Sequence, residues 1–310
     1  MSTLNLSIEK IEKLNPLEIV TDDNVRDRFI QIYDTLHGNG EAAYVRESNY
    51  FSAILRDKEA LQKASKFSIF TAFIDLAICG LSLQQGTHAQ CYLEGRKYVI
   101  GTNPNGNKIY ENRVVLTISG YGELMLRTMN GQIKYADNPV IVYEGDEFSF
   151  SDKGGRKEVE YTCKLSHNKK HIIACYIRIT RADGSVDYSV MLEDEWLRLK
   201  DYSEKNNKKW NDTVKQYEYK ANPLYSSNDG QIDTGFLIAK CIKHAFKTYP
   251  KLKVGQNTEL ETLAPDNMDE YYDEDYQPKP QQPSFAEPND YAEGVTINNE
   301  QKDTEDDGTF

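Results

Sequence analysis

The first part of the chain carries hydrophobic residues at helical spacing. Val25, Phe29, Ile30, Tyr33 and Leu36 recur every three or four residues, after capping candidates at 21–23 and before Gly38. A second apolar series occupies 41–56. A third, over 65–79, is apolar on almost every side and ends at Gly80. The pattern predicts three helices, the third of them buried.

After Gly86 the pattern changes to short β-like runs separated by turn residues. Strands are expected at 89–93, 97–100, 113–119, 133–136, 140–144 and 147–151, and a hairpin pairs 171–180 with 186–192. Helical spacing returns at 121–129, 193–200 and 233–249, and Pro250 ends the last helix. Residues 201–230 are polar, so we expect a flexible excursion there. The fold class is therefore α+β, with an antiparallel sheet of hairpins and a meander packed with helices.

Charge divides the chain into two parts. The chain has a net charge of −12, but the 55 residues after Gly255 hold 16 acids and only two bases, so they alone carry −14 and the rest carries +2. Half of the ten prolines lie in the same segment, and its apolar residues show no period. We therefore expect a loose N-terminal arm over 1–20, a folded core over 21–255 and a disordered acidic tail over 256–310. The apolar residues Leu4, Leu6, Ile8, Ile11 and Leu14 could instead dock the arm on the body, and the boundary of the tail is expected between about Val254 and Leu263.

Several protein classes do not fit this sequence. No stretch approaches the roughly 18 apolar residues of a membrane span, and the polar N-terminus lacks the apolar run of a signal peptide. The five cysteines are an odd number spread through apolar runs, as in a reduced cytosolic protein with buried thiols.

Motifs for nucleotide, metal or nucleophilic chemistry are missing. The sequence contains no phosphate-binding loop for ATP, no Cys-x-x-Cys pair and no Gly-x-Ser-x-Gly elbow. His167 and His171 flank two lysines in a turn, so no metal site is expected. Glu144, Asp146 and Glu147 surround Gly145 between two strands, which fits a solvated turn or a pair of catalytic carboxylates.

Basic residues recur beside aromatic residues and glycines. Such a set suits single-stranded nucleic acid, because Lys and Arg follow phosphates while rings stack on bases. A solvated basic face is the alternative, above all for the last helix, where four bases share one face. The candidate contacts are Arg96, Lys97, Lys108, Arg113, Tyr121, Arg127, Lys134, Lys240, Lys243, His244 and Lys247.

Four stretches, in order, resemble the RecT family of phage recombinases. They are Phe67–Leu83 with the following His88–Leu93, then Val114–Leu124, then Val142–Phe148, which reads VYEGDEF, and finally the basic helix Ala239–Pro250. The resemblance spans roughly residues 45–252. It implies a structural role for the acidic turn at Gly145.

The resemblance implies an ATP-independent single-strand annealing protein, not an enzyme, that needs no cofactor. It would bind single-stranded DNA and the annealed duplex intermediate in a basic groove, and it would form rings or helical filaments. Arg113, Arg127, Lys134, Lys240, Lys243 and Lys247 would contact phosphates, and Tyr121 would face a nucleotide or pack in the core. The expected setting is the cytoplasm of a bacterial host, with a phage exonuclease and a host single-stranded-DNA-binding protein as possible partners.

The acidic tail allows three interpretations. It could simply solvate the chain, it could occupy the basic groove as a DNA mimic, or its tip could bind partners through Asp306, Asp307 and Phe310. Two other functions also stay open at this stage. One is a hydrolase that uses the carboxylates near Gly145, and the other is an interaction scaffold that does not bind DNA.

Overall fold

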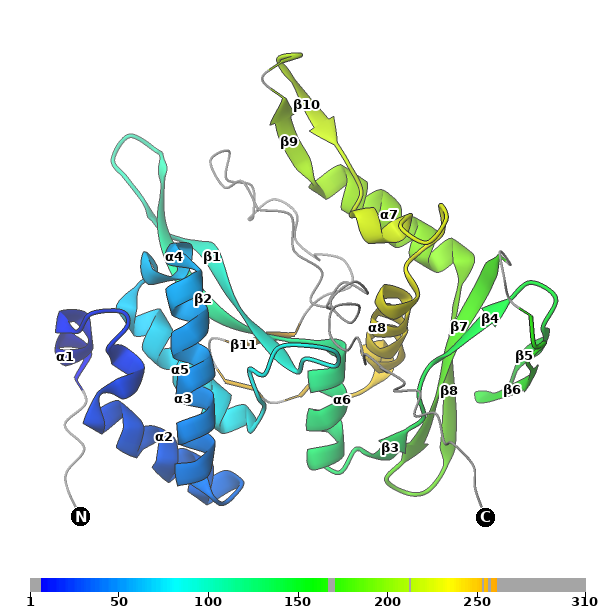
Figure 1. The fold of residues 1–310 in the computed structure, drawn as a ribbon, viewed down its shortest axis with the longest axis horizontal. Helices are drawn as coiled ribbons and strands as arrows, with labels where there is room; N and C mark the ends of the chain where they lie inside the picture. Colours follow the sequence, from blue (N-terminus) through cyan, green and yellow to red (C-terminus); the bar gives the residue numbers. More distant parts are fainter. Residues whose placement is uncertain (1–6, 167–170, 212, 253, 256–257, 261–310) are drawn as a thin grey trace, which may run out of the picture.

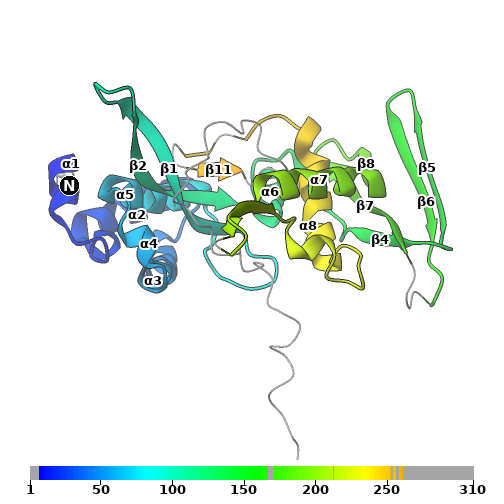
Figure 2. The ribbon, with the colours of Figure 1, turned by 90° about the horizontal axis from the view of Figure 1, so that it is seen from above.

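The computed structural model describes residues 7–166, 171–211, 213–252, 254–255 and 258–260. These residues form two lobes that lie side by side, with α6 (Gly120–Met129) and α8 (Thr234–Ala245) between them (Figure 1). Figure 2 shows the same order of lobes from above. The architecture is α+β with predominantly antiparallel strand pairing, which confirms the predicted fold class.

Helices make up most of the N-terminal lobe. These are α1 (Ile8–Lys13), η1 (Ile19–Thr21), α2 (Asp23–Leu36), α3 (Gly40–Asp57), α4 (Glu59–Gln62) and α5 (Lys66–Cys79). Asp22 caps α2 by accepting hydrogen bonds from the N–H groups of Asn24 and Val25. Gly80 ends α5 in the left-handed conformation, as the sequence predicts.

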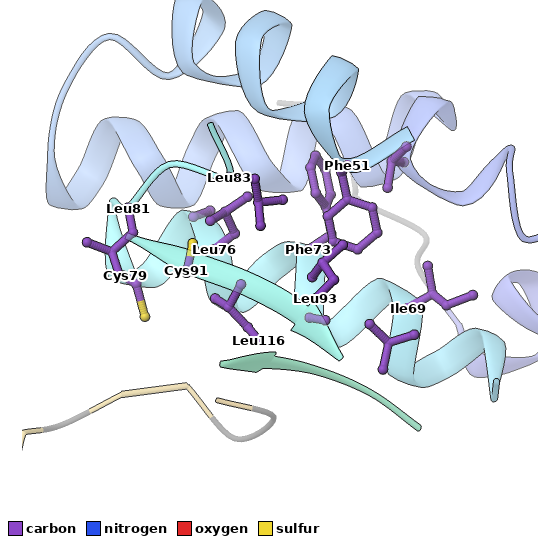
Figure 3. Packing of buried hydrophobic residues seen from close by; sticks show 14 of the residues in the cluster. Phe51, Ile69, Phe73, Leu76, Cys79, Leu81, Leu83, Cys91, Leu93 and Leu116 are labelled. Atoms are coloured by element: carbon purple, nitrogen blue, oxygen red, sulfur yellow. The ribbon is translucent and has the colours of Figure 1, made fainter. Parts of the chain in front are cut away.

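Helix α5 packs on the hairpin formed by β1 (Cys91–Thr102) and β2 (Lys108–Ile118). Phe73 on α5 is fully buried, and its ring centroid lies 4.5 Å from that of Phe29 and 5.2 Å from that of Phe51. Figure 3 shows Phe51 and Phe73 in this core. The Ser68 hydroxyl accepts a hydrogen bond of 2.9 Å from the Val114 N–H, which ties the start of α5 to β2. Leu93 and Leu116 face the same core, so the opposite face of the hairpin is turned away from the helices.

A second core fills the C-terminal lobe. Its sheet places β3 (Ile133–Ala136) and β4 (Val140–Tyr143) on one edge of β7 (Ile172–Arg181) and β8 (Val186–Leu192) on the other. The hairpin of β5 (Glu147–Lys153) and β6 (Arg156–Thr162) packs beside it. Helix α8 lies on one face of the sheet, where Leu237 and Cys241 meet Cys175 and Ile177 in the core.

Helix α6 joins the two cores. Leu126 belongs to the N-terminal core, while Tyr121 and Leu124 pack on the C-terminal one. A Cβ added to Gly122 would lie 2.0 Å from the Gln90 carbonyl oxygen, so the helix can approach this backbone only with glycine there.

The chain then returns from the C-terminal lobe to the N-terminal lobe through residues 246–260, which we call the strap. It begins with η3 (Phe246–Thr248) and ends with β11 (Thr258–Leu260), which pairs in parallel with residues 116–118 of β2. Leu252 is buried in the N-terminal core. Burial raises the pKa of the Cys79 thiol to about 11, although hydrogen bonds with Gly255 and Thr258 of the strap oppose that effect.

Two of the expected domain limits differ from what the structure describes. Ile11, Ile19 and Val20 are buried, so the described part of the expected loose arm packs on the body because its apolar residues find a core. Thr258–Leu260, assigned to the tail, form a strand because β2 offers them a free edge. The rest of the tail, including Asp306, Asp307 and Phe310, lies outside the described residues.

The expected flexible excursion at 201–230 is also largely structured. Helix α7 (Glu193–Asn206) continues past residue 200, and β9 (Lys208–Asn211) pairs with β10 (Gln216–Tyr219) before η2 (Pro223–Tyr225). Over the residues that the structure describes, no helix is both long and apolar enough to cross a membrane.

Candidate nucleic-acid interface

The face of the β1–β2 hairpin that is turned away from the helices carries two facing arginines. Arg96 and Arg113 are Cα partners in the ladder, and their side chains are 25% and 37% exposed. The Arg113 guanidinium lies over the ring of Tyr98, 5.1 Å from its centroid. A cation pair beside an aromatic ring is the combination that contacts phosphates and bases. Tyr98 is not among the sequence candidates, although strand alternation places it on the same face as Arg96.

Each of these arginines also has an acidic neighbour. Arg96 is 3.0 Å from Glu94, and Arg113 pairs with Glu111. Partly exposed ion pairs contribute only about 0–1 kcal/mol, so a phosphate can replace the carboxylate at little cost. The face therefore presents two aligned cations whose present partners are weakly held.

Lys97 and Lys108 lie elsewhere on the hairpin. Lys97 alternates to the opposite face from Arg96, where it is half-buried, and its Cα partner is Asn112. Lys108 is exposed near the hairpin turn. The structure thus brings Arg96 and Arg113 together but not these two lysines.

Tyr121 is half-buried at the start of α6. Its ring centroid lies 4.4 Å from that of His88, and burial raises the pKa of its hydroxyl. It also packs on the C-terminal core. Of the two roles expected for Tyr121, these contacts favour the packing one.

Arg127 is a core residue, which corrects its assignment to phosphate contact. Its side chain is 2% exposed and is held by Glu123, by Gln132 at 2.7 Å and by the Pro250 carbonyl at 3.1 Å. Its guanidinium also lies 4.7 Å from the ring centroid of Phe246 and 5.3 Å from that of Tyr249. A cation enclosed in this way has no surface for DNA.

Two lysines on the basic face of the last helix are buried rather than solvated. Lys240 and Lys243 are 9% and 5% exposed, and the Lys243 side chain packs near Gly120. The Lys240 amino group lies 4.8 Å from the ring centroid of Phe236. This burial disfavours the phosphate contacts predicted for Lys240 and Lys243.

His244 is turned toward the sheet and toward α7. One ring nitrogen lies 3.0 Å from Glu195, and the other forms a 3.1 Å hydrogen bond with the Ser189 hydroxyl. Burial lowers the pKa of His244, although Glu195 opposes that effect. These contacts correct its assignment to the DNA-binding set.

Lys134 and Lys247 are exposed, on β3 and η3 respectively. Lys247 belongs to a basic stretch, 234–258, that holds five lysines and no acid. The exposed Lys251 in this stretch is not among the sequence candidates and could have been found by counting charge along the strap. The strap thus exposes Lys247 and Lys251, whereas Lys240 and Lys243 of α8 are buried.

The acidic turn at Gly145 has a structural role in the hairpin. The Asp146 carboxylate accepts hydrogen bonds from the N–H groups of Tyr143 and Lys164, at 3.0 Å and 2.9 Å, and from the Tyr161 hydroxyl at 3.1 Å. Lys164 pairs with Glu147 at 2.7 Å and lowers the pKa of that carboxyl. Asp146 is thus committed to holding the turn, which disfavours the hydrolase.

The described residues hold no cluster of three His, Cys, Asp or Glu side chains that could bind a metal ion. His167 lies outside the described residues, and His171 pairs with Glu193 at 2.9 Å.

Comparison with known proteins gives one match. The model of the RecT family matches residues 47–220, which is more than half of the chain and covers the acidic turn, both hairpin strands and α6. No curated protein and no solved structure matches the chain.

Proposed function

Because the chain belongs to the RecT family, whose members act in phage single-strand annealing recombination, we propose that it binds single-stranded DNA and pairs complementary strands without ATP. The proposed contact surface is the outer face of the β1–β2 hairpin, continued along the strap. Strand β2 supports this continuity, since it carries Arg113 and pairs at residues 116–118 with β11 of the strap.

The proposed reaction makes and breaks no covalent bond. Two complementary strands repel each other through their phosphates, and arginines on a common face reduce that repulsion while releasing counterions. The bases must stay accessible, so that Watson–Crick pairing selects the partner strand. The observation that carries this proposal beyond the family match is the facing pair Arg96 and Arg113 beside Tyr98.

Oligomers belong to the same proposal. We propose that copies assemble on the DNA as rings or helical filaments, in the cytoplasm of a bacterial host. An exonuclease that exposes the strands and a host single-stranded-DNA-binding protein are the proposed partners.

The direct test is annealing of two labelled complementary oligonucleotides without ATP, across a salt series. We expect fast annealing by the wild type at low salt that slows as salt rises. In R96Q/R113Q, DNA affinity should fall about tenfold or more, and the salt dependence should weaken by about 0.7 in slope per lost phosphate contact.

A matched control is R28Q/R56Q, which removes the same charge from exposed positions on α2 and α3. This control should anneal like the wild type. Failure of the wild type to anneal at low salt would contradict the function. Equal loss in both double variants would instead contradict the hairpin face as the specific contact.

A further inference from the structure

The C-terminal lobe carries a projecting arm, residues 193–222, made of α7, β9 and β10. Its base is fixed in the core, where Trp196 and Leu199 are 4% and 5% exposed. From there the arm extends away from the lobe, on the same side of the molecule as the β1–β2 hairpin (Figure 1). The arm and the β1–β2 hairpin thus project from different lobes toward one side.

Hydrogen bonds at Ser203 fasten the hairpin of the arm to its helix. The Ser203 hydroxyl accepts a hydrogen bond of 2.9 Å from the Asn222 N–H and another of 3.3 Å from the Asn207 side-chain amide. The Lys220 N–H donates to the Asn207 carbonyl at 3.4 Å. These bonds close the hairpin at its base, so the arm is a continuous extension of α7.

The hairpin of the arm carries exposed aromatic rings that belong to neither of the two hydrophobic cores. Tyr217 and Tyr219 are 40% and 50% exposed, and they lie two residues apart on β10, so they share one face. Tyr219 also borders a shallow depression with Asp201, Glu204 and Lys205 of α7. Rings in a folding core would be buried, so their exposure on a fastened hairpin indicates a contact surface.

The lysine content of this hairpin indicates a negatively charged partner. Residues 208–220 hold four lysines and two acids, in a chain whose net charge is −12. Exposed rings in a lysine-rich stretch of sequence match single-stranded nucleic acid, in which every base offers a face for stacking and every nucleotide a phosphate. The lysines and tyrosines of this segment show no core-forming period, which is why the sequence alone predicts only a flexible excursion over 201–230.

We propose that the arm is a second contact for single-stranded DNA, in which Tyr217 and Tyr219 stack on unpaired bases. The inference rests on the proposed function and adds a base-stacking surface on the other lobe. A strand held by both lobes would lie across the junction and the strap. The arm would then hold bases by their faces and leave their Watson–Crick edges accessible, as pairing with a second strand requires.

The test compares full-length wild type, Y217A/Y219A and Y217F/Y219F for binding to a labelled oligothymidine and to an abasic strand of the same length. We expect the alanine variant to bind oligothymidine about tenfold more weakly, because each stacked ring contributes substantially to affinity. The phenylalanine variant keeps the rings and should bind like the wild type. On the abasic strand all three proteins should bind alike, because no base is present to stack.

The outcomes separate this inference from the proposed function. A wild type that binds neither strand contradicts the proposed function itself. A wild type that binds and anneals normally while the alanine variant matches it on oligothymidine overturns the arm contact. The arm contact is also overturned if the alanine variant loses affinity equally for oligothymidine and the abasic strand. It is overturned as well if the alanine substitutions change the sedimentation of the DNA-free protein, because the arm would then be a contact between copies of the chain. Circular dichroism checks that both variants fold.

Discussion

Arg127 is a large charged side chain enclosed in the interior of the protein. It contacts the rings of Phe246 and Tyr249, is paired with Glu123, and is bonded to the carbonyl of Pro250. Through these contacts one side chain connects α6 to the beginning of the strap. Removing it would leave the Glu123 carboxylate buried without its cation, which is a costly state.

We expect R127A to lower the free energy of unfolding by about 3–5 kcal/mol, the usual cost of breaking a buried ion pair. Urea denaturation measures this loss. In E123A/R127A, where no orphaned charge remains, the loss should be smaller than the sum of the two single variants. An R127A protein as stable as the wild type would show that Arg127 does not hold the strap.

At the scale of elements, α8 shows what periodicity can and cannot predict. The helix, its capping residue Asp233 and its end before Pro250 follow from the sequence. The spacing also places Lys240, Lys243 and His244 on one side, as expected. Periodicity does not identify the elements that pack on this side: α6 lies against Lys243, whereas β8 and α7 contact His244, so these side chains are buried or half-buried.

The strength of the local sequence pattern also explains which other elements the sequence predicts and which it does not. Helices α2, α3 and α5 and the hairpin of β7 and β8 have strong local patterns, and they form where expected. Strand β6 and the arm have mixed polar patterns, so hydrophobic periodicity does not reveal them although each strand pairs with its neighbour in a local hairpin. Of the candidate site, alternation along β1 and β2 could place Arg96 and Arg113, whereas the burial of Arg127 depends on Pro250, far along the chain.

The strap offers an element-scale prediction at Gly255. A Cβ at this position would lie 2.0 Å from the Asp75 carboxylate oxygen, and Asp75 is buried and cannot easily move aside. G255A should therefore cost about 1–3 kcal/mol of stability, as overpacking does. Thermal unfolding measures it. The control is G101A, where nothing lies within 4 Å of the added Cβ, and it should unfold close to the wild-type temperature.

At the scale of the whole molecule, charge is split between body and tail. Residues 261–310 hold 15 acids and two bases, whereas residues 1–260 hold 35 bases and 34 acids. Strand β11 brings the start of this acidic segment to β2, beside the proposed DNA contact. Its charge thus begins close to the surface that phosphates would approach.

Replacing the acids of 266–275 with their amides should raise the affinity for single-stranded DNA several-fold at low salt, because like charges near the contact repel the strand or compete with it. The gain should shrink as salt screens the interaction. Fluorescence anisotropy across a salt series measures both effects. Equal affinities of the two proteins at low salt would support a tail that only solvates the chain.

The strap also imposes an order on the folding of the protein during its synthesis. Strand β11 completes the edge of β2 from about 140 residues further along the chain, a long-range closure that carries a high entropic cost. During synthesis the N-terminal helices and the β1–β2 hairpin emerge first, yet β2 waits for its last partner until the whole C-terminal lobe has left the ribosome. A chain cut short before residue 258 would leave that edge open to pairing with other chains. The edge of β2 can therefore be completed only after the whole C-terminal lobe has been synthesised.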